Sequence, residues 1–361
     1  MNKALNLSKY LNDAIEHIIS DALKSSLKNP KETAFILKYI ATNKKAKKIR
    51  NSFIENGDSI PPFLIASITT SCNLFCKGCY ARANESCGEQ VHGNIMSPEQ
   101  WLEVFNQAKE IGVAFILLAG GEPLMNRDVI EKASSIKEIA FPIFTNGTLI
   151  NDNYIQLFDR NRNLIPILSI EGNEYQTDDR RGNGTYNKLM GVMDKLNHNG
   201  IFYGASVTVT TENIDTVTSS DFINTLYIKG TKVLFFVEYV PVNAETKHLA
   251  PTDVERSTLE DRQNSLRMEY ENMIFLSFPG DEKHTGGCLA GGRGFFHINA
   301  KGGAEPCPFS PYSDTNLKDV TLIEALKSPF FQKLRNSELL AGEHTGGCLL
   351  FEKEKEVKEL L

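Results

Sequence analysis

Three cysteines in one short loop are the residues whose types and spacing point most directly to chemistry. Cys72, Cys76 and Cys79 are separated by three and two residues and follow the apolar run at 63–68. Thiolates at this density favour zinc or an iron–sulfur cluster. No fourth Cys or His stands at ligand spacing within the loop. Three ligands on a four-iron cluster leave one iron open, and an open iron can bind a substrate or a cofactor.

A second set of cysteines, Cys288, Cys307 and Cys348, lies toward the carboxyl end of the chain. Two of them, Cys288 and Cys348, are the fifth residue of the same six-residue sequence, His-Thr-Gly-Gly-Cys-Leu, which begins at His284 and again at His344. Paired glycines let backbone N–H groups approach a cluster sulfur, and such hydrogen bonds tune the cluster's potential. The set predicts a second iron–sulfur cluster, with a structural zinc ion as the alternative.

The first loop resembles the cluster-binding motif of the radical S-adenosylmethionine enzymes, a Cys-x3-Cys-x2-Cys loop after the first strand of a barrel. The resemblance implies that Cys72, Cys76 and Cys79 hold a [4Fe-4S] cluster whose open iron is chelated by S-adenosylmethionine. In that family the reduced cluster cleaves S-adenosylmethionine to methionine and a 5'-deoxyadenosyl radical, which abstracts hydrogen from a substrate. This sequence departs at Gly78, where the family often has an aromatic residue, and we expect Tyr80 to cover the adenine instead.

Residues after the predicted strands extend the resemblance to the cofactor. In the family a run like Gly120-Gly121-Glu122-Pro123 binds the amino group of S-adenosylmethionine: the glycines permit close approach and the carboxylate meets the ammonium. Asn146 lies in a Thr-Asn-Gly turn that is frequent in the same family. Ser169 resembles the residue that bonds the ribose, and Arg181, with Arg180 as the alternative, the one that meets the methionine carboxylate. Without the resemblance, Ser169 would be a small core residue and the arginines a surface turn.

The second cysteine set resembles part of an auxiliary-cluster module. The spacing of Cys288, Gly302 and Cys307 is similar to the opening of the module called SPASM. The dense group of four cysteines expected next is absent, and only Cys348 remains. The resemblance therefore implies a shortened, twitch-like module with one auxiliary iron–sulfur cluster. Its fourth ligand stays open between Cys87, His284, His344, the substrate and a water molecule.

Apolar runs that alternate with helical stretches predict the frame that must position these groups. Six candidate strands lie at Phe63–Thr70, Val113–Ala119, Phe141–Thr145, Ile165–Ile170, Phe202–Thr210 and Lys232–Val240. Alternation of this kind predicts an α/β fold with a parallel sheet and right-handed crossovers. The number of units matches the partial (β/α)6 TIM-like barrel of the family, in which chemistry gathers at the carboxyl ends of the strands. Glu238, near the end of the sixth run, must face a substrate or be paired if it is buried.

Four segments follow from this pattern. They are an N-terminal helical extension at 1–60, the barrel at 61–242, a connector at 243–282 and the auxiliary iron–sulfur module at 283–361. The extension has an apolar stripe at helical spacing and no strand pattern, so it does not resemble the leader-binding module of many peptide-modifying relatives. We interpret its basic cluster at 44–50 as a solvated helix face, with docking of an acidic partner or peptide leader as the alternative.

Composition limits the compartment and the partners. A formal net charge of -6 provides no basic field for nucleic acid, and no apolar run is long enough for a membrane span. Seven cysteines in grouped positions, without a signal peptide, indicate ligand sets in a reducing cytoplasm. The seventh, Cys87, has three open interpretations: a free cysteine, an auxiliary ligand or a catalytic thiol.

The sequence as a whole predicts a cytoplasmic radical S-adenosylmethionine enzyme. The resemblance implies a flavodoxin- or ferredoxin-type electron donor and a peptide or small-molecule substrate. The alternative from another class is a non-catalytic iron–sulfur electron carrier or redox sensor. The Gly-Gly-Glu-Pro run argues against that alternative, because a carrier has no need to chelate an amino acid.

Overall fold

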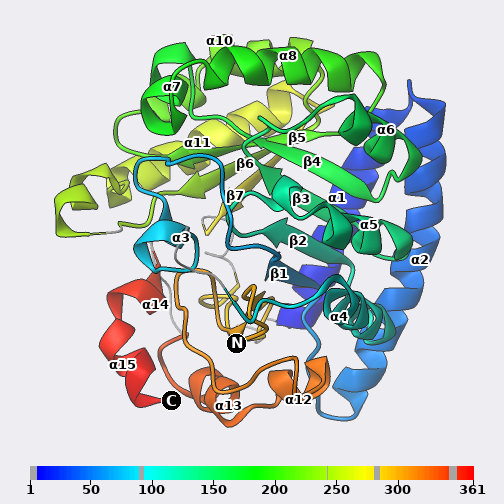
Figure 1. Ribbon diagram of the computed structural model, residues 1–361, viewed down its shortest axis with the longest axis vertical. Helices are drawn as coiled ribbons and strands as arrows, with labels where there is room; N and C mark the ends of the chain where they lie inside the picture. Colours follow the sequence, from blue (N-terminus) through cyan, green and yellow to red (C-terminus); the bar gives the residue numbers. More distant parts are fainter. Residues whose placement is uncertain (1–5, 89–92, 242, 280–284, 341–347) are drawn as a thin grey trace, which may run out of the picture.

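One open sheet organises the chain (Figure 1). The computed structural model describes residues 6–88, 93–241, 243–279, 285–340 and 348–361. Within these ranges the strands are β1 Phe63–Ser67, β2 Phe115–Ala119, β3 Phe141–Thr145, β4 Leu164–Ser169, β5 Gly204–Val209, β6 Val233–Glu238, β7 Ile274–Phe278, β8 His297–Ile298 and β9 Ala304–Glu305. Their order is β7-β6-β5-β4-β3-β2-β1-β8-β9, and every neighbouring pair is parallel except β8 with β9. The sheet therefore does not close, and the predicted partial barrel is confirmed.

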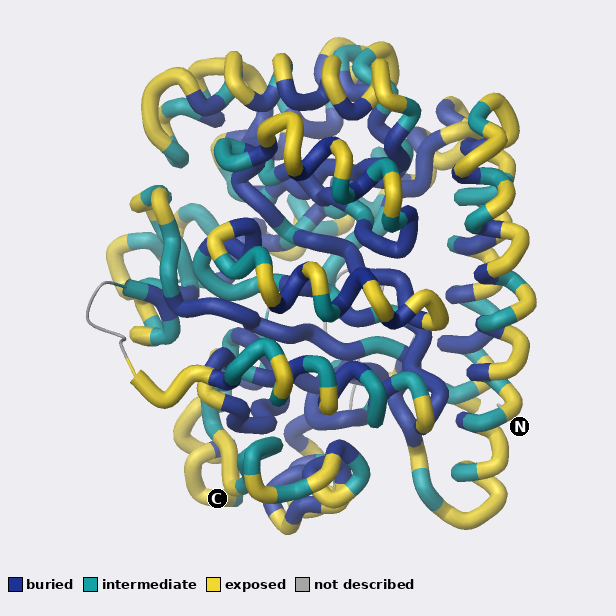
Figure 2. Tube along the Cα trace, turned by 45° about the vertical axis from the view of Figure 1, so that its right-hand side comes forward, coloured by how far each residue is buried: buried dark blue, intermediate teal, exposed yellow. Residues whose placement is uncertain are grey.

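Helices join the parallel strands and cover the outside of the sheet, so the strands are buried and the outer helix faces exposed (Figure 2). The α-helices are α1 Leu7–Ser26, α2 Pro30–Glu55, α3 Tyr80–Ala83, α4 Pro98–Glu110, α5 Arg127–Ser135, α6 Asp152–Arg160, α7 Glu174–Arg181, α8 Thr185–His198, α9 Ile214–Val217, α10 Ser220–Lys229, α11 Asp253–Glu269, α12 Leu322–Leu326, α13 Pro329–Asn336, α14 Leu349–Glu352 and α15 Glu354–Glu359. Two short 3-10 helices, η1 Pro123–Met125 and η2 Ala244–Leu249, complete the set. None of the described helices is both long and apolar enough to cross a bilayer.

The six predicted strands exist, and a seventh parallel strand was missed. Strand β7 lies within 243–282, which the sequence predicted to be a connector. It pairs with β6, with Ile274 opposite Val233. Its run Ile-Phe-Leu-Ser-Phe is short and stands between polar stretches, so its apolar signal is weak until β6 offers an edge to pair with. The barrel is thus one strand larger than predicted.

The N-terminal helices close the amino end of the barrel. Ile15 and Ile19 of α1 pack with Ala114, Phe202 and Ile274, which stand at or just before the starts of three strands. The predicted apolar stripe is therefore confirmed, and it faces the bottom of the sheet. Burial of this stripe against the strand starts makes α1 the floor of the barrel.

The basic cluster of α2 is not wholly a solvated face, and for Arg50 that interpretation was wrong. Arg50 is 2% exposed. Its guanidinium donates to Asn12 Oδ1 at 2.6 Å and to the Gly112 carbonyl. Burial lowers the pKa of Arg50 to about 10. Arg50 therefore fastens α2 to α1 and to the turn before β2.

The β8–β9 hairpin attaches the C-terminal segment to the barrel sheet. Ile65 and Ala66 of β1 pair with His297 and Ile298 of β8. His297 Nε2 lies 2.7 Å from Ser67 Oγ, and His297 Nδ1 lies 2.7 Å from Glu305 Oε2. All three side chains are buried, so a continuous polar chain links the end of β1 to the strand that precedes Cys307.

Candidate functional site

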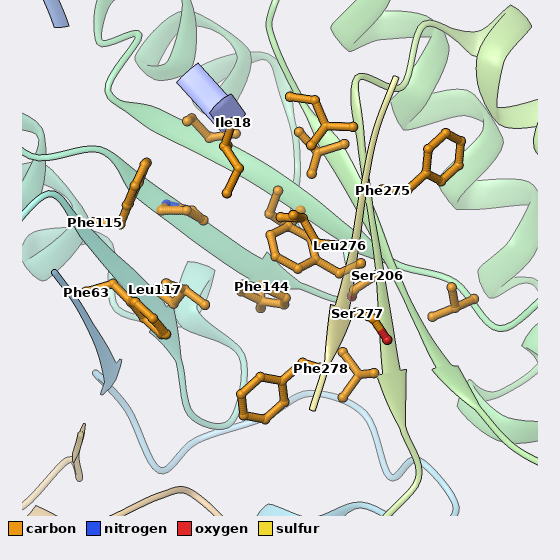
Figure 3. Close-up of a pocket in the computed structure, with 18 of the residues that line it drawn as sticks. Ile18, Phe63, Phe115, Leu117, Phe144, Ser206, Phe275, Leu276, Ser277 and Phe278 are labelled. Carbon is orange, nitrogen blue, oxygen red and sulfur yellow. The ribbon is translucent and has the colours of Figure 1, made fainter. Parts of the chain in front are cut away.

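A cavity of about 1670 Å³ occupies the open barrel. Its walls along the strands are largely apolar, and Ile18 of α1 points into it (Figure 3). Its walls at the strands include Phe63, Phe115, Leu117, Phe144, Leu276 and Phe278. At the carboxyl ends of the strands the lining becomes polar and contains most of the predicted site residues: Cys72, Cys76, Cys79, Gly120, Gly121, Glu122, Asn146, Ser169 and Arg181. Pro123 is not in the lining, because it begins η1 behind the wall.

The three thiols of the loop influence one another. Burial raises the pKa of Cys76, and the nearby thiols of Cys79 and Cys72 act in the same direction. A hydrogen bond with the Cys87 thiol lowers the pKa of Cys72 to about 6. Cys87, whose role the sequence left open, is therefore a neighbour of the first cysteine set. Among the described residues, no three Cys, His or carboxylate groups lie at the spacing that a single metal ion needs.

The two glycines after β2 support the thiol loop. A Cβ on Gly121 would stand 2.1 Å from the Ser71 carbonyl oxygen and 3.1 Å from Cys72 Cβ. A Cβ on Gly120, whose φ is +118°, would stand 2.4 Å from the Thr69 carbonyl oxygen. The amides of Gly121 and Glu122 donate to the Thr69 and Ser71 carbonyls at 3.0 and 2.8 Å. The glycines therefore allow the backbone after β2 to touch the start of the loop.

The Glu122 carboxylate lies beside this contact and accepts three hydrogen bonds. Its Oε1 accepts from Thr145 Oγ1 at 2.6 Å and from the Leu124 amide at 3.0 Å, and its Oε2 accepts from the Asn146 amide at 2.8 Å. The carboxyl group is 1% exposed, and burial raises its pKa to about 7. Thr145, which the sequence did not single out, thus orients this carboxylate. The signal for it was available, since Thr145 ends a strand beside Asn146.

Asn146 reaches the thiol loop from β3. Its Nδ2 donates to Asn73 Oδ1 at 2.9 Å. Asn73 Nδ2 in turn donates to Thr148 Oγ1 at 2.8 Å. The turn after β3 therefore makes two hydrogen bonds with the residue that follows Cys72. Asn146 therefore acts on the loop itself in addition to lining the cavity.

Both candidate arginines converge on Glu171, which follows β4. Arg181 Nε donates to Glu171 Oε1 at 2.8 Å, and Arg180 Nη1 lies 2.8 Å from Glu171 Oε2. Arg181 Nη1 also points to Cys76 Sγ at 3.9 Å. Glu171, at 1% exposure, thereby fixes a guanidinium next to the thiol set. Ser169 stands on the same side of the cavity, with its Oγ 3.4 Å from Ser206 Oγ.

Tyr80 is near cysteines of both thiol sets. Its ring packs on Phe309 with centroids 4.9 Å apart. Burial raises the pKa of Tyr80, and the thiols of Cys79 and Cys307 act in the same direction. The aromatic side chain that meets Gly78 is instead Tyr239, which follows β6.

The C-terminal cysteines share one core. Cys307 is buried in the main apolar core, which also spans the barrel, and Cys288 and Cys348 are partly buried against that core. The Gly291 amide donates to the Pro306 carbonyl at 3.1 Å, which brings the turn after Cys288 beside Cys307. His284 and His344, two of the predicted alternatives for a fourth ligand, lie outside the described residues.

Helix α11 supplies part of the wall near β6 and β7. Arg256 Nε donates to Glu238 Oε2 at 3.0 Å, and both residues line the cavity. Of the two alternatives for Glu238, pairing is therefore what the structure contains. The sequence missed Arg256, because its partner lies 18 residues away across a turn.

Comparison with known proteins agrees with this geometry. Residues 66–226 match the family model described as the Radical SAM superfamily. The sporulation killing factor maturation protein SkfB of Bacillus subtilis is 26% identical over 264 residues, or 69% of this chain and 60% of SkfB. The AdoMet-dependent heme synthase of Methanosarcina barkeri is 24% identical over 309 residues, or 78% of this chain and 87% of the synthase.

A solved structure shares the fold. Streptococcus suis SuiB bound to S-adenosylmethionine matches with a TM-score of 0.68 at 17% identity. The match covers 84% of this chain and 77% of SuiB. At this identity the likeness concerns the arrangement of strands and helices.

Proposed function

Because the chain belongs to the radical SAM superfamily, we propose that it reductively cleaves S-adenosylmethionine and uses the 5'-deoxyadenosyl radical to abstract hydrogen from a substrate in the barrel. The observation that carries the proposal is the meeting of three thiols, a buried carboxylate and a fixed guanidinium at one end of one cavity. An electron carrier needs the thiols alone. The carboxylate and the guanidinium are the groups that an amino acid ligand requires.

The residues present fit the cluster and the cofactor. Cys72, Cys76 and Cys79 would hold a [4Fe-4S] cluster, and three ligands leave one iron for the cofactor. When bound and reduced, this cluster supplies the electron that breaks the sulfonium. Glu122 would accept hydrogen bonds from the cofactor's ammonium, and Arg181 would donate to its carboxylate.

Other residues of the chain hold these groups in position. Thr145 and the Asn146 amide orient the Glu122 carboxylate, and Glu171 orients Arg181. The backbone after β2, with Gly120 and Gly121, supports the start of the thiol loop. Ser169, which lines the cavity, would bond the ribose.

A second cluster at Cys288, Cys307 and Cys348 is part of the proposal. The hydrogen bond from the Gly291 amide to the Pro306 carbonyl, which joins the segments of Cys288 and Cys307, supports it, and Tyr80 is near both Cys79 and Cys307. An auxiliary cluster would anchor the substrate or take an electron back from the product radical. A flavodoxin- or ferredoxin-type protein would supply the electron for the first cluster.

The substrate is proposed to be a peptide side chain or a small molecule with a substantial apolar part. The apolar side chains along the strands support the apolar part, since polar groups beside them would lose water without gaining partners. The two relatives differ in this respect, one named for maturation of a killing factor and the other for heme synthesis. A gene for a short Cys-rich peptide beside this one would favour the peptide.

The test is anaerobic reconstitution with iron and sulfide, followed by dithionite, S-adenosylmethionine and chromatography for 5'-deoxyadenosine. The proposal expects 5'-deoxyadenosine and methionine in equal amounts. A chain that loads iron but releases neither product, beside a control enzyme that turns over, would instead be the electron carrier or redox sensor. Added candidate substrates should raise the rate of 5'-deoxyadenosine formation, and mass spectrometry then identifies the modified atom.

A further inference from the structure

The turn after α3 holds Cys87 beside the first thiol set. The Cys87 amide donates to the Ala81 carbonyl at 2.8 Å, so the chain folds back on the helix that it has just left. The next amide, that of Gly88, donates to the Thr70 carbonyl at 3.1 Å. Thr70 stands two residues before Cys72. The backbone therefore joins the segment of Cys87 to the start of the thiol loop.

The thiols of Cys72 and Cys87 are in direct contact. The Cys87 S–H group donates a hydrogen bond to Cys72 Sγ. Cys76, by contrast, has Arg181 Nη1 at 3.9 Å from its Sγ. Cys87 is 5% exposed, whereas Cys72 is partly exposed and lines the cavity. A small oxidant that enters the cavity therefore meets Cys72 and not Cys87.

A buried thiol in contact with an accessible one has a defined oxidation chemistry. Peroxide converts the accessible thiol to a sulfenic acid, and the neighbouring thiol condenses with it to a disulfide. Without such a neighbour, further oxidation gives a sulfinic acid, which thiol reductants do not reverse. A disulfide is reopened by thiol–disulfide exchange. The neighbouring thiol therefore keeps the accessible one recoverable.

We propose that Cys87 is the resolving cysteine of Cys72, and that the pair forms a reversible disulfide when oxidation removes the cluster from the first thiol set. This inference rests on the proposed function, which assigns Cys72 to that cluster. It gives the seventh cysteine a role outside both ligand sets. The disulfide blocks cluster loading, and its reduction returns Cys72 as a ligand.

The oxidation takes two steps, with hydrogen peroxide as the oxidant. Cys72 Sγ attacks one peroxide oxygen, the O–O bond breaks, and a sulfenic acid and one water form. Cys87 Sγ then attacks the sulfur of Cys72, so an S–S bond forms and the S–O bond breaks. The hydroxide that leaves takes the Cys87 thiol proton and becomes the second water. Two thiols lose two electrons in total, and the peroxide gains them.

The experiment treats the anaerobically reconstituted full chain with hydrogen peroxide until the cluster absorbance has gone. Trypsin cleaves after Lys77 and Arg82, so Cys72 and Cys87 lie in separate peptides. Mass spectrometry without reductant should find these peptides joined, and fragmentation should assign the bond to Cys72 and Cys87. Dithiothreitol should separate the peptides, and a second reconstitution should restore about eight iron per chain.

Cys87→Ser removes the resolving thiol and changes little else. Before oxidation its iron content should equal that of the unmodified chain. After oxidation Cys72 should carry a sulfinic acid, and dithiothreitol with a second reconstitution should restore only about four iron per chain. Ser86→Ala is the matched control, because Ser86 Oγ donates to the Ala81 carbonyl at 3.1 Å in the same turn. That variant changes the turn, keeps both thiols and should recover like the unmodified chain.

Other outcomes overturn the inference in distinct ways. Full recovery of iron by Cys87→Ser, or a disulfide from Cys87 to a cysteine other than Cys72, would remove its role as resolving cysteine. A low iron content of Cys87→Ser before oxidation would make Cys87 a cluster ligand instead. Failure of Ser86→Ala to recover would assign the effect to the shape of the turn. If the reconstituted chain releases no 5'-deoxyadenosine before oxidation, the proposed function fails, and the peptide map still reports on the disulfide separately.

Discussion

The two thiol sets are built in opposite ways. Cys72 to Cys79 is a local loop, and its neighbours along the chain are tied to the ends of β2 and β3 by short-range backbone and amide hydrogen bonds. Cys288, Cys307 and Cys348 are spread over a much longer stretch, and each packs into or against the main apolar core of the molecule. The first set is thus specified by local sequence, whereas the second depends on tertiary packing. Substitutions should separate the two sets in both metal content and chemistry.

The largest expected effect is loss of the first set. Cys76→Ala removes the thiol beside Arg181 and leaves two ligands in the loop. Reconstituted iron should fall from about eight to about four per chain. The rate of 5'-deoxyadenosine formation should fall to about one-thousandth or less, because the proposed site of electron transfer is gone. Iron analysis and chromatography on the same sample check both statements.

Retention of S-adenosylmethionine cleavage by Cys76→Ala would contradict the roles assigned to the two thiol sets. It would mean that the C-terminal thiols, and not the loop, carry the chemistry. A circular dichroism spectrum equal to that of the unmodified chain is the required control, since the variant must be folded for either result to count.

The next effect is on the support of the loop. In Gly121→Ala the new Cβ would stand 2.1 Å from the Ser71 carbonyl oxygen, which is backbone and cannot turn aside. The free energy of unfolding should fall by about 1–3 kcal/mol, the usual cost of overpacking. Iron at the first set should be lost preferentially. Urea unfolding of the metal-free chain and iron analysis after reconstitution measure the two effects.

A glycine elsewhere provides the matched control. Gly191 lies within α8, and a Cβ there would meet nothing within 4 Å. Gly191→Ala should keep full iron and gain about 0.5–1 kcal/mol, because alanine favours the helix. Equal behaviour of the two variants would contradict the role assigned to Gly121.

Loss of the C-terminal thiols should change the rate of S-adenosylmethionine cleavage little and abolish substrate-dependent turnover. The variant Cys288→Ala/Cys307→Ala/Cys348→Ala should retain about four iron per chain. Cleavage of S-adenosylmethionine without substrate should stay within about threefold of the unmodified rate, a change of less than 1 kcal/mol in the barrier. Substrate-dependent turnover should be lost. Elemental analysis that finds zinc in place of the second four irons would refute the auxiliary cluster.

The same contrast explains what the sequence could predict. The first thiol set could be predicted because the spacing of Cys72, Cys76 and Cys79 is local. Strand β3 was predicted at its observed bounds, Phe141–Thr145. Contacts between segments far apart in the chain could not be predicted from the sequence. Nothing in the sequence joins Gly78 to Tyr239, and Arg256 finds Glu238 only once α11 packs beside β6.

Strand β7 and Arg50 are two further features that the sequence did not predict. Periodicity gave six strands, yet β7 was missed because its five residues stand between polar stretches that were together interpreted as a connector. Arg50 was assigned to solvent because four lysines precede it within six residues, although its guanidinium is buried between α1 and the turn before β2. Charge runs predict average exposure and cannot identify the one member that turns inward.

The smallest expected effect is a pH dependence that belongs to the first set alone. Burial raises the pKa of Glu122 to about 7, so the carboxyl is protonated below that pH. A protonated carboxyl cannot pair with an ammonium group. The affinity for S-adenosylmethionine should therefore fall as pH drops below about 7, by up to about tenfold per unit, and stay level above it.

Glu122→Gln isolates this titration. The amide keeps the shape of the side chain but neither ionises nor attracts the ammonium, so binding at pH 8 should weaken by about tenfold or more. Its affinity should be constant between pH 6 and 8, where that of the unmodified chain changes. Equilibrium binding under anaerobic conditions, with the cluster absorbance recorded at each pH, measures both. A pH dependence that survives in Glu122→Gln would assign the titration to another group and remove Glu122 from the ammonium contact.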